Sequence, residues 1–172
     1  KVNLANKIKN TEAFCQQSDA ERVLNYYSKG HGADGVVVAA ASKSDDIISL
    51  AFNLCRKKGR VVVVGDVGLS LKRKDFYKKE IDFFIATSYG PGRYDDSYEL
   101  FGQDYPYAFV RWTENRNMLL YLDLIESGSI NIDFLTENIF DIEESEVAYE
   151  TVKKSESVIA ILFDHHCLIN ES

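Results

Sequence analysis

Four consecutive valines, Val61–Val64, stand between a basic segment that ends in glycine and a Gly-Asp-Val-Gly turn. A strand with one exposed face would alternate apolar and polar residues, so this run predicts a strand buried on both faces. Strands of that kind belong to parallel sheets, in which neighbours are joined by crossovers of a dozen or more residues. A strand-like run at Val36–Ala40 and a helical pattern come first, so residues 36–65 are predicted to form one β-α-β unit.

The segment before this unit predicts mainly helices. Lys1–Asn10 has the spacing of a short amphipathic helix, and Thr11–Cys15 fits at best a short strand. Ser18 and Glu21 have the spacing of a capping box, in which two side chains satisfy free backbone N–H groups at a helix start. A helix is therefore expected to run to about Lys29, followed by a glycine-rich turn into the first strand.

The helix inside the β-α-β unit has candidate caps at Ser42–Asp45 and a stripe of apolar residues, namely Ile48, Ala51, Phe52 and Cys55. Its last turn is expected to carry Arg56–Lys58, where cations interact favourably with the helix dipole, and Gly59 ends it. This basic run and Lys72–Lys74 are better explained by a helix end and a solvated loop than by contact with nucleic acid.

The second half of the chain predicts one more buried strand and then a break. A short helical stretch near Phe76–Ile81 precedes the strand Phe83–Ser88. Two glycines flank a proline in Tyr89–Arg93, which must be a loop. Tyr94–Trp112 is rich in tyrosine and aspartate without a period, so a long irregular loop with packed aromatic side chains is expected.

Two helices and two strands are expected to close the chain. Thr113 should cap the first helix, which ends before Gly128 and whose apolar face carries Met118, Tyr121, Leu122 and Ile125. The other elements expected are a short strand within Leu135–Phe140, a helix behind a second capping box at Asp141 and Glu144, a strand at Ser157–Phe163 and a tail at Asp164–Ser172.

Ligands of open parallel sheets bind beyond the carboxyl ends of the strands. Ala39–Ser42 and Gly65–Gly68 follow the two strands of the β-α-β unit, and they are therefore the first places to look for a ligand. Two roles stay open for Asp66, which can bind a coenzyme hydroxyl or cap the turn that follows it.

Composition narrows the class of protein. The chain has 172 residues, enough for one domain with a real core and too few for two full-sized ones. A net charge of -7 gives no electrostatic reason to expect nucleic acid or an anionic membrane as partner, and no apolar run approaches the roughly 20 residues that span a bilayer. The three cysteines, Cys15, Cys55 and Cys167, form no Cys-x-x-Cys pair, which suggests a reducing, cytoplasmic setting.

Several polar residues allow both a functional and a structural interpretation. His31 could relay protons, but a position between two glycines is typical of a solvated turn. Arg93 and Arg111 could bind an anionic substrate or pair with Asp95, Asp96 or Glu114. His165–Cys167 places three soft ligands side by side, without the spacing that lets side chains converge on one ion, so no metal site is assigned.

Several segments together resemble a known family. They are Gly30–Asp34 before a valine strand, the run Lys57–Gly68, and Asp141–Glu150 ahead of the final strand. In this combination the sequence resembles the zinc-type medium-chain alcohol dehydrogenases. Tyr89–Asp95 and Tyr105–Met118 resemble most closely the threonine-dehydrogenase-like members, which include two-domain oxidoreductases found among sugar and polysaccharide genes.

The resemblance implies an α/β fold, a Rossmann-like parallel sheet with flanking helices. Residues 1–163 would form part of an NAD(P)-binding domain with the family's closing helix and strand, and residues 164–172 a tail. The family's first two strands, its phosphate-binding glycine turn and its zinc-binding catalytic domain would lie before Lys1. One departure is Ile159, which stands where some alcohol dehydrogenases place an arginine that meets the coenzyme phosphates.

The resemblance also implies where coenzyme would bind. The loop Ala39–Ala41 would line the pocket. The segments Gly65–Val67 and Ser88–Gly90 would frame the nicotinamide end, where family members offer backbone groups to the carboxamide. The implied cofactor-binding residues are Ala39, Ala40, Ala41, Gly65, Asp66, Val67, Ser88, Tyr89 and Gly90. No catalytic residue and no metal ligand is implied within this chain.

The function so implied is hydride transfer between a small alcohol, polyol or sugar and NAD or NADP in a full-length enzyme, with zinc held only by the part before Lys1. Without the two preceding strands, Val36–Ala40 would be an open apolar edge that favours pairing with another chain, so a homodimer is expected. The alternative is a non-catalytic α/β domain for regulation or assembly, which fold alone does not exclude.

Overall fold

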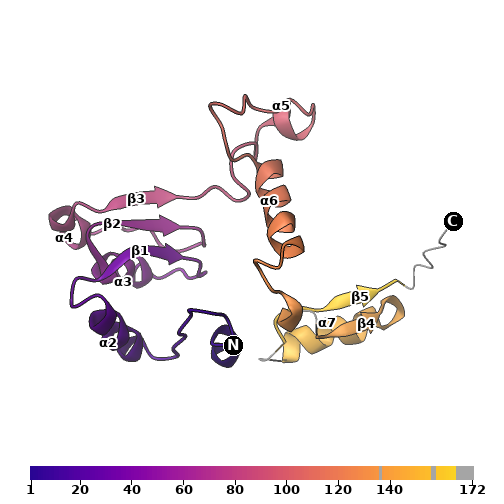
Figure 1. The fold of residues 1–172 in the computed structure, drawn as a ribbon, viewed down its shortest axis with the longest axis horizontal. Coiled ribbons are helices and arrows are strands. Elements are labelled where there is room, and N and C mark those ends of the chain that lie inside the picture. Colours follow the sequence, from indigo (N-terminus) through magenta and orange to yellow (C-terminus); the bar gives the residue numbers. More distant parts are fainter. Residues whose placement is uncertain (136, 156–157, 166–172) are drawn as a thin grey trace. The chain divides into compact units, whose positions relative to one another are not determined.

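The computed structural model describes residues 1–135, 137–155 and 158–165. The chain divides into two compact units, one of which is Phe14–Leu119 and the other Lys1–Ala13 together with the residues from Leu120 onward. Figure 1 traces the elements of both units along the chain. The unit Phe14–Leu119 contains every residue that the sequence predicts to bind coenzyme.

A parallel sheet of three strands organises this unit. It consists of β1 (Ala33–Val38), β2 (Cys55–Val63) and β3 (Asp82–Ile85), in the order β1-β2-β3. Helix α3 (Asp46–Leu54) provides the crossover from β1 to β2, and both neighbouring pairs of strands are parallel. The predicted β-α-β unit and the predicted parallel α/β fold class are thereby confirmed.

The hydrophobic core of the unit lies between the sheet and α3. Its buried residues come from these elements and the loop after β2, and they are Val38, Ile48, Ala51, Phe52, Cys55, Val61, Val63 and Val67. The ring centroid of Phe52 lies 5.5 Å from that of Phe83 and 5.2 Å from that of Phe76. Because side chains alternate between the faces of a strand, the buried residues in the second half of β2 are Gly59, Val61 and Val63.

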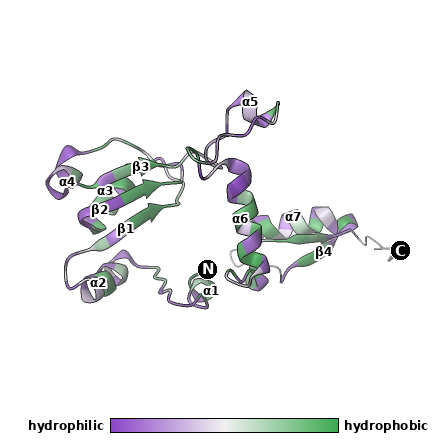
Figure 2. Cartoon of the chain, turned by 45° about the horizontal axis from the view of Figure 1, so that its top comes forward, coloured by the Kyte–Doolittle hydropathy of each residue, from purple (hydrophilic) through white to green (hydrophobic). Residues whose placement is uncertain are grey.

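The opposite face of the sheet stays exposed within the described residues. Val37, Val62 and Phe84 form one row across the three strands on that face. Val37 is 67% exposed and Phe84 49% exposed, although Figure 2 shows the ends of the strands as hydrophobic. The prediction that the valine strand is buried on both faces is therefore wrong for the described part of the chain, because α3 covers one face only.

The basic run after α3 belongs to β2. The helix stops at Leu54 and Cys55 already has an extended backbone, so the predicted last turn with Arg56–Lys58 is wrong. The end of α3 is instead satisfied by Lys79, whose Nζ donates at 3.0, 2.8 and 2.8 Å to the backbone oxygens of Phe52, Asn53 and Cys55. A lysine from a distant segment thus supplies the positive charge expected from the neighbouring one.

The other helices of this unit are α2 (Gln17–Tyr27), α4 (Arg73–Phe76), the 3-10 helix η1 (Tyr77–Lys79) and α5 (Asp96–Glu99). The capping box expected at Ser18 and Glu21 does not form. The helix begins after Gln16, and the carboxylate of Glu21 accepts a hydrogen bond from the Gln17 side chain at 2.6 Å. The strand expected at Thr11–Cys15 is absent from these described residues.

Helix α6 (Glu114–Glu126) starts and ends where the sequence predicts. Oγ1 of Thr113 accepts from the backbone N–H of Arg116 at 3.5 Å, and Gly128 follows the helix with a φ of +69°. Figure 2 shows the helix changing from hydrophilic at its start to hydrophobic in later turns. Its predicted apolar face is largely exposed among the described residues, with Met118 at 51% and Leu122 at 60%.

The second unit contains a two-stranded parallel sheet of β4 (Ile139–Asp141) and β5 (Leu162–Asp164). Its helices are α1 (Val2–Ala5), η2 (Asp133–Leu135), η3 (Ile142–Glu144) and α7 (Ser145–Lys154). Of the predicted strand Ser157–Phe163, Ser157 lies outside the described residues, Val158–Ile161 are not in a strand, and β5 includes Asp164, the first residue of the expected tail. The tail beyond His165 lies outside the described residues. A helical turn, η3, begins after Asp141 as the capping box predicts, but neither Asp141 at η3 nor Glu144 at α7 makes a side-chain cap bond. None of the helices in the described residues has the length and apolar content to cross a membrane.

Candidate functional site

The loops after β1 and β2 are joined by backbone hydrogen bonds at the carboxyl edge of the sheet. The carbonyl of Val38 accepts from the N–H of Gly65 at 2.9 Å, and the N–H of Ser42 donates to the carbonyl of Asp66 at 2.8 Å. Ser42 also forms an isolated parallel bridge with Val67. The two loops predicted to line the coenzyme pocket therefore lie side by side.

Two glycines make this close approach possible. A Cβ on Gly65 would lie 2.0 Å from the carbonyl oxygen of Ala40, and a Cβ on Gly68 would lie 2.4 Å from Oδ1 of Asp45. The same Oδ1 accepts from the N–H of Ser70 at 2.9 Å. Asp45, which the sequence offered as a cap candidate for α3, makes no side-chain cap bond there and instead holds the segment after β2.

The exposed groups of this edge are few. Ala39, Ala40 and Ala41 are exposed, and Val67 is buried in the core. The carboxylate of Asp66 is exposed and accepts no hydrogen bond within the part of the chain that the structure describes. Of the two roles left open for Asp66, turn capping is thus not observed, and coenzyme binding stays a prediction.

The third predicted segment, Ser88–Gly90, follows β3. Strand pairing continues to Ala86, whose N–H donates to the carbonyl of Val63 at 2.8 Å. Beyond it, the carbonyl of Tyr89 accepts from Nδ2 of Asn117 at 3.0 Å, so this turn is attached to the first turn of α6. Among the described residues no hydrogen bond links Ser88–Gly90 to the first two loops, and a shared ligand stays a prediction.

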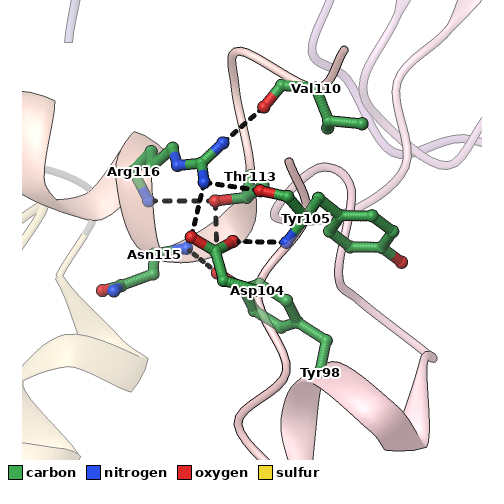
Figure 3. Close-up of polar contacts among 7 residues, drawn as sticks. All are labelled: Tyr98, Asp104, Tyr105, Val110, Thr113, Asn115 and Arg116. Atoms are coloured by element: carbon green, nitrogen blue, oxygen red, sulfur yellow. Dashed lines mark hydrogen bonds and ion pairs between the residues drawn. The ribbon is translucent and has the colours of Figure 1, made fainter. Parts of the chain in front are cut away.

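A polar cluster forms where the long loop meets α6, and Figure 3 draws its members: Tyr98, Asp104, Tyr105, Val110, Thr113, Asn115 and Arg116. We call it the Arg116 cluster. The guanidinium of Arg116 donates to the backbone oxygens of Val110 and Tyr105 and pairs with the carboxylate of Asp104. Its side chain is only 16% exposed. One arginine therefore closes the loop by satisfying backbone groups that no strand or helix pairs.

Thr113 lies at the base of this cluster and is completely buried. The hydroxyl of Tyr98 donates to Oγ1 of Thr113 at 3.2 Å and accepts from the backbone N–H of Asn115 at 3.1 Å. A buried hydroxyl needs a hydrogen-bond partner, and Tyr98 supplies it here. The sequence predicted the helix cap but not the tyrosine that completes it.

Asp95 and Tyr105 form a second hydrogen-bonded pair in the same loop. The hydroxyl of Tyr105 donates to the carboxylate of Asp95, which also accepts from the N–H of Ser97 at 2.9 Å as the N-cap of α5. The Tyr105 hydrogen bond lowers the pKa of Asp95 and raises the pKa of Tyr105. Hydrogen bonds to the charged form of a carboxyl group stabilise that form.

Arg93 and Arg111 differ in their partners. Arg93 forms an ion pair, but with Glu99 and not with Asp95, Asp96 or Glu114, and this pairing raises the pKa of the guanidinium. Arg111 has no carboxylate partner in the described part of the chain, and its guanidinium lies 4.0 Å from the ring centroid of Trp112 and 4.7 Å from that of Tyr107. An ion pair for Arg111 is therefore not observed, and anion binding stays open for it.

The other candidates do not form a site. His31 is exposed in the turn before β1, which agrees with a solvated position. His166 and Cys167 lie outside the described residues, and the described ones contain no group of three metal-ligating side chains. Cys55 is buried, and burial raises the pKa of its thiol, which disfavours the reactive thiolate.

Two surface hollows of about 400 Å³ each lie away from the predicted coenzyme residues. One is lined by residues at the amino ends of the strands, including His31, Leu54 and Lys79. The other is lined partly by Glu99, Asp104 and Glu114. Ligands of parallel sheets bind at the carboxyl edge, opposite to the first hollow, and the second hollow lies between the long loop and α6. Neither hollow is therefore assigned to coenzyme.

No model of a known protein family matches the sequence, and no curated protein matches it. Solved structures do match the fold. AibC is 17% identical with a TM-score of 0.64 and covers 95% of this chain, which covers 41% of AibC. The alcohol dehydrogenase TADH from Thermus sp. ATN1 is 18% identical with a TM-score of 0.60, and the shares covered are 95% and 42%.

A third match is a short chain alcohol dehydrogenase (rspB) from E. coli CFT073, solved in complex with the cofactor NADH. It is 15% identical with a TM-score of 0.59, and the shares covered are 88% of this chain and 37% of rspB. The chain thus spans about two fifths of the length of the proteins it matches. At this identity the likeness establishes a Rossmann-like α/β fold shared with dehydrogenases.

Proposed function

We propose that this chain is the coenzyme-binding part of an NAD(P)-dependent alcohol, polyol or sugar dehydrogenase of the zinc-containing medium-chain type. The observation that carries the proposal is the carboxyl edge of the sheet. There, hydrogen bonds from the N–H groups of Gly65 and Ser42 join the loops after β1 and β2, and Ala39–Ala41 and Asp66 are exposed. Parallel α/β sheets bind their ligands at that edge. The structural likeness to alcohol dehydrogenases, one of them bound to NADH, supports this choice of ligand.

The residues present fit one end of the coenzyme. Ala39–Ala41, Ser88 and Tyr89 are exposed, and their backbone groups are proposed to meet a carboxamide, while the carboxylate of Asp66 offers an acceptor for a hydroxyl. The described residues show no glycine turn that opens a helix toward this edge, which is how such folds hold a pyrophosphate. The proposed pocket is therefore a wall for the nicotinamide end, and the phosphates need residues before Lys1.

Bound NAD or NADP would supply the hydride acceptor or donor at this wall. The contribution of this chain is to fix the ring and keep water away from it. Zinc, which polarises the alcohol in the resembled family, is proposed to be held before Lys1, as that resemblance implies. Small-molecule alcohols are the proposed substrates, and a cytoplasmic location is proposed with them.

A titration with NADH tests the proposal. Ala41→Trp fills an exposed position of the edge without disturbing a described hydrogen bond, so it should weaken NADH binding by the full-length protein at least tenfold. Ala108→Trp, at an exposed alanine in the long loop, is the matched control and should bind as the natural protein does. Equal affinity in all three proteins would reject the pocket.

Self-association is proposed as a consequence of the open strand edge. β1 pairs only with β2 among the described residues, and Val37 on it is 67% exposed. Apolar edges of this kind favour pairing with a second copy, so a homodimer is expected. Val37→Lys should shift the protein toward monomer in light scattering. A monodisperse monomer before the substitution would contradict the dimer.

The exposed apolar face of the sheet also supports the alternative, a non-catalytic domain for regulation or assembly. Val37, Val64 and Phe84 are each about half exposed or more, as expected of a surface that another protein covers. The two functions differ in one observation. A Gly-x-Gly-x-x-Gly turn and Cys or His zinc ligands before Lys1 would favour the enzyme, and their absence from the full-length sequence would favour assembly.

A further inference from the structure

The turn after β3 is attached to α6 by hydrogen bonds at Tyr89 and Pro91. The carbonyl of Tyr89 accepts from Nδ2 of Asn117 at 3.0 Å, and the carbonyl of Pro91 accepts from the backbone N–H of Glu114 at 2.8 Å. A Cβ on Gly92 would lie 2.7 Å from the ring of Tyr98. Contacts at three residues within one short turn leave its backbone little freedom.

Gly90 and Asn117 fit each other closely. Gly90 has a φ of +100°, a conformation that side chains rarely adopt, and a Cβ there would lie 2.7 Å from Nδ2 of Asn117. Gly90 therefore allows the chain to turn and leaves room for the side-chain amide of Asn117, which donates to the carbonyl of Tyr89. Asn117 itself is placed by the helix, because its backbone N–H donates to the carbonyl of buried Thr113 at 2.8 Å.

Tyr89 is held through its ring as well. The guanidinium of Arg93 lies 5.8 Å from the ring centroid of Tyr89, and Arg93 is itself fixed by Glu99. The turn is thus formed before any ligand arrives. Backbone groups that are already in place recognise a ligand without the entropy cost of ordering a loop.

We propose that Asn117 is the positioning residue of the segment Ser88–Gly90, and that it makes this segment select the nicotinamide half of the coenzyme. The inference rests on the proposed function, since it assumes that these backbone groups meet the carboxamide. Asn117 acts through the carbonyl of Tyr89 and does not need to touch the coenzyme. Its loss should therefore weaken contacts to nicotinamide and leave contacts to adenosine and phosphates as they are.

The test compares two ligands on the full-length protein. NADH carries the nicotinamide, and ADP-ribose is the fragment of the dinucleotide without it. Asn117→Asp keeps the size of the side chain but removes the N–H donor facing the Tyr89 carbonyl. We expect NADH affinity to fall about three- to tenfold, the range of one net hydrogen bond, and ADP-ribose affinity to stay within about twofold.

The matched control is Asn115→Asp, which puts the same charge into the same helical turn. The side chain of Asn115 is exposed and makes no described hydrogen bond, so both affinities should stay unchanged. Asn117→Ala gives a second test, because it removes the donor without adding a charge. ADP-ribose binding in each sample also reports that the variant is folded.

Each outcome decides a different point. Selective loss of NADH affinity in both Asn117 variants supports the positioning role. Equal loss of NADH and ADP-ribose affinity means that Asn117 serves the fold only, and unchanged NADH affinity means that it does not hold the segment; both overturn the inference and leave the proposed function standing. A natural protein that binds neither ligand overturns the proposed function and the inference together.

Discussion

A side chain on Gly65 would collide with the main chain at Ala40, whose carbonyl oxygen lies 2.0 Å from the place of a Cβ. The two main chains are this close because hydrogen bonds join the loops after β1 and β2. One of these bonds runs from the N–H of Gly65 to the carbonyl of Val38 at 2.9 Å. Only a residue without a side chain allows the two backbones to come this close.

Gly65→Ala should therefore destabilise the chain. We expect a loss of about 1–3 kcal/mol in the free energy of unfolding, the usual range for a methyl group forced into a filled space. Denaturant unfolding followed by circular dichroism measures it. Gly35→Ala is the control, because a Cβ there would meet only the carbonyl of Arg60 at 3.8 Å, an ordinary contact. Equal stability of the two variants would show that the loops are not packed as described.

Arg116 and Arg111 offer a second pair of matched substitutions. Arg116→Lys keeps the charge beside Asp104 but loses the planar fork that reaches the carbonyls of Val110 and Tyr105. It should reduce the free energy of unfolding by about 1–3 kcal/mol, since two partly buried carbonyls would lose their donors. Arg111→Lys, at a guanidinium that only stacks on aromatic rings, should change it by less than about 1 kcal/mol. A larger effect at Arg111 would contradict this assignment.

The sequence predicted those features that follow from local spacing. The β-α-β unit, the loop at Tyr89–Arg93, the cap at Thr113 and the stop at Gly128 are all found, because turn chemistry and apolar period decide them within a few residues. The carboxyl edge of β1 and β2 followed from the rule that parallel strands end at one side of a sheet.

What the sequence could not predict depends on contacts between distant segments. The carbonyl groups at the end of α3 accept hydrogen bonds from Lys79, which lies more than 20 residues later in the chain. The sequence instead predicts that Arg56–Lys58 provide this charge, but they belong to β2. Neither capping box makes its side-chain bonds: α2 begins at Gln17, earlier than the spacing of Ser18 and Glu21 indicates, and Asp141 precedes η3 without a side-chain cap bond. The sequence gives no indication of a role for Asn117, because its partner, the carbonyl of Tyr89, lies 28 residues earlier in the chain.

The pair of Asp95 and Tyr105 predicts a dependence of stability on pH. The pKa of Asp95 is lower in the folded chain than its ordinary value of about 3.9, so the pair stabilises the fold above that pH and loses its effect as the pH falls through the folded pKa. The pKa of Tyr105 is raised, so the effect is present below its ordinary value of about 10 and is lost as the pH rises through the folded pKa.

Tyr105→Phe tests this by removing the donor. The difference in free energy of unfolding between this variant and the natural chain should be greatest near neutral pH and shrink at both extremes. Tyr107→Phe is the control, because the Tyr107 ring contacts Arg111 and Arg116 and its hydroxyl makes no described hydrogen bond. A difference for Tyr105→Phe that stays constant from pH 3 to pH 7, measured by urea unfolding at about one-unit steps, would show that no hydrogen bond to an ionised Asp95 is involved.

The last prediction concerns the 172-residue chain by itself, which should lack dehydrogenase activity and bind dinucleotide weakly. In the resembled family, pyrophosphate is held by backbone N–H groups of a glycine turn at a helix N-terminus. At the sheet edge the described residues offer exposed backbone, the carboxylate of Asp66, which repels a phosphate, and the side chain of Lys43, but no glycine turn at a helix start. A few such contacts must also overcome the entropy cost of association, about 4 kcal/mol or more.

Calorimetry with NADH and NADPH, followed by an activity screen with threonine, simple alcohols and sugar alcohols, measures both parts of this prediction. We expect dissociation constants in the millimolar range or no detectable heat, and rates equal to a buffer blank. The same titration on the full-length protein serves as the positive control. Micromolar binding by the 172-residue chain would mean that its own residues hold the phosphates, and would place a complete coenzyme site on the edge described here.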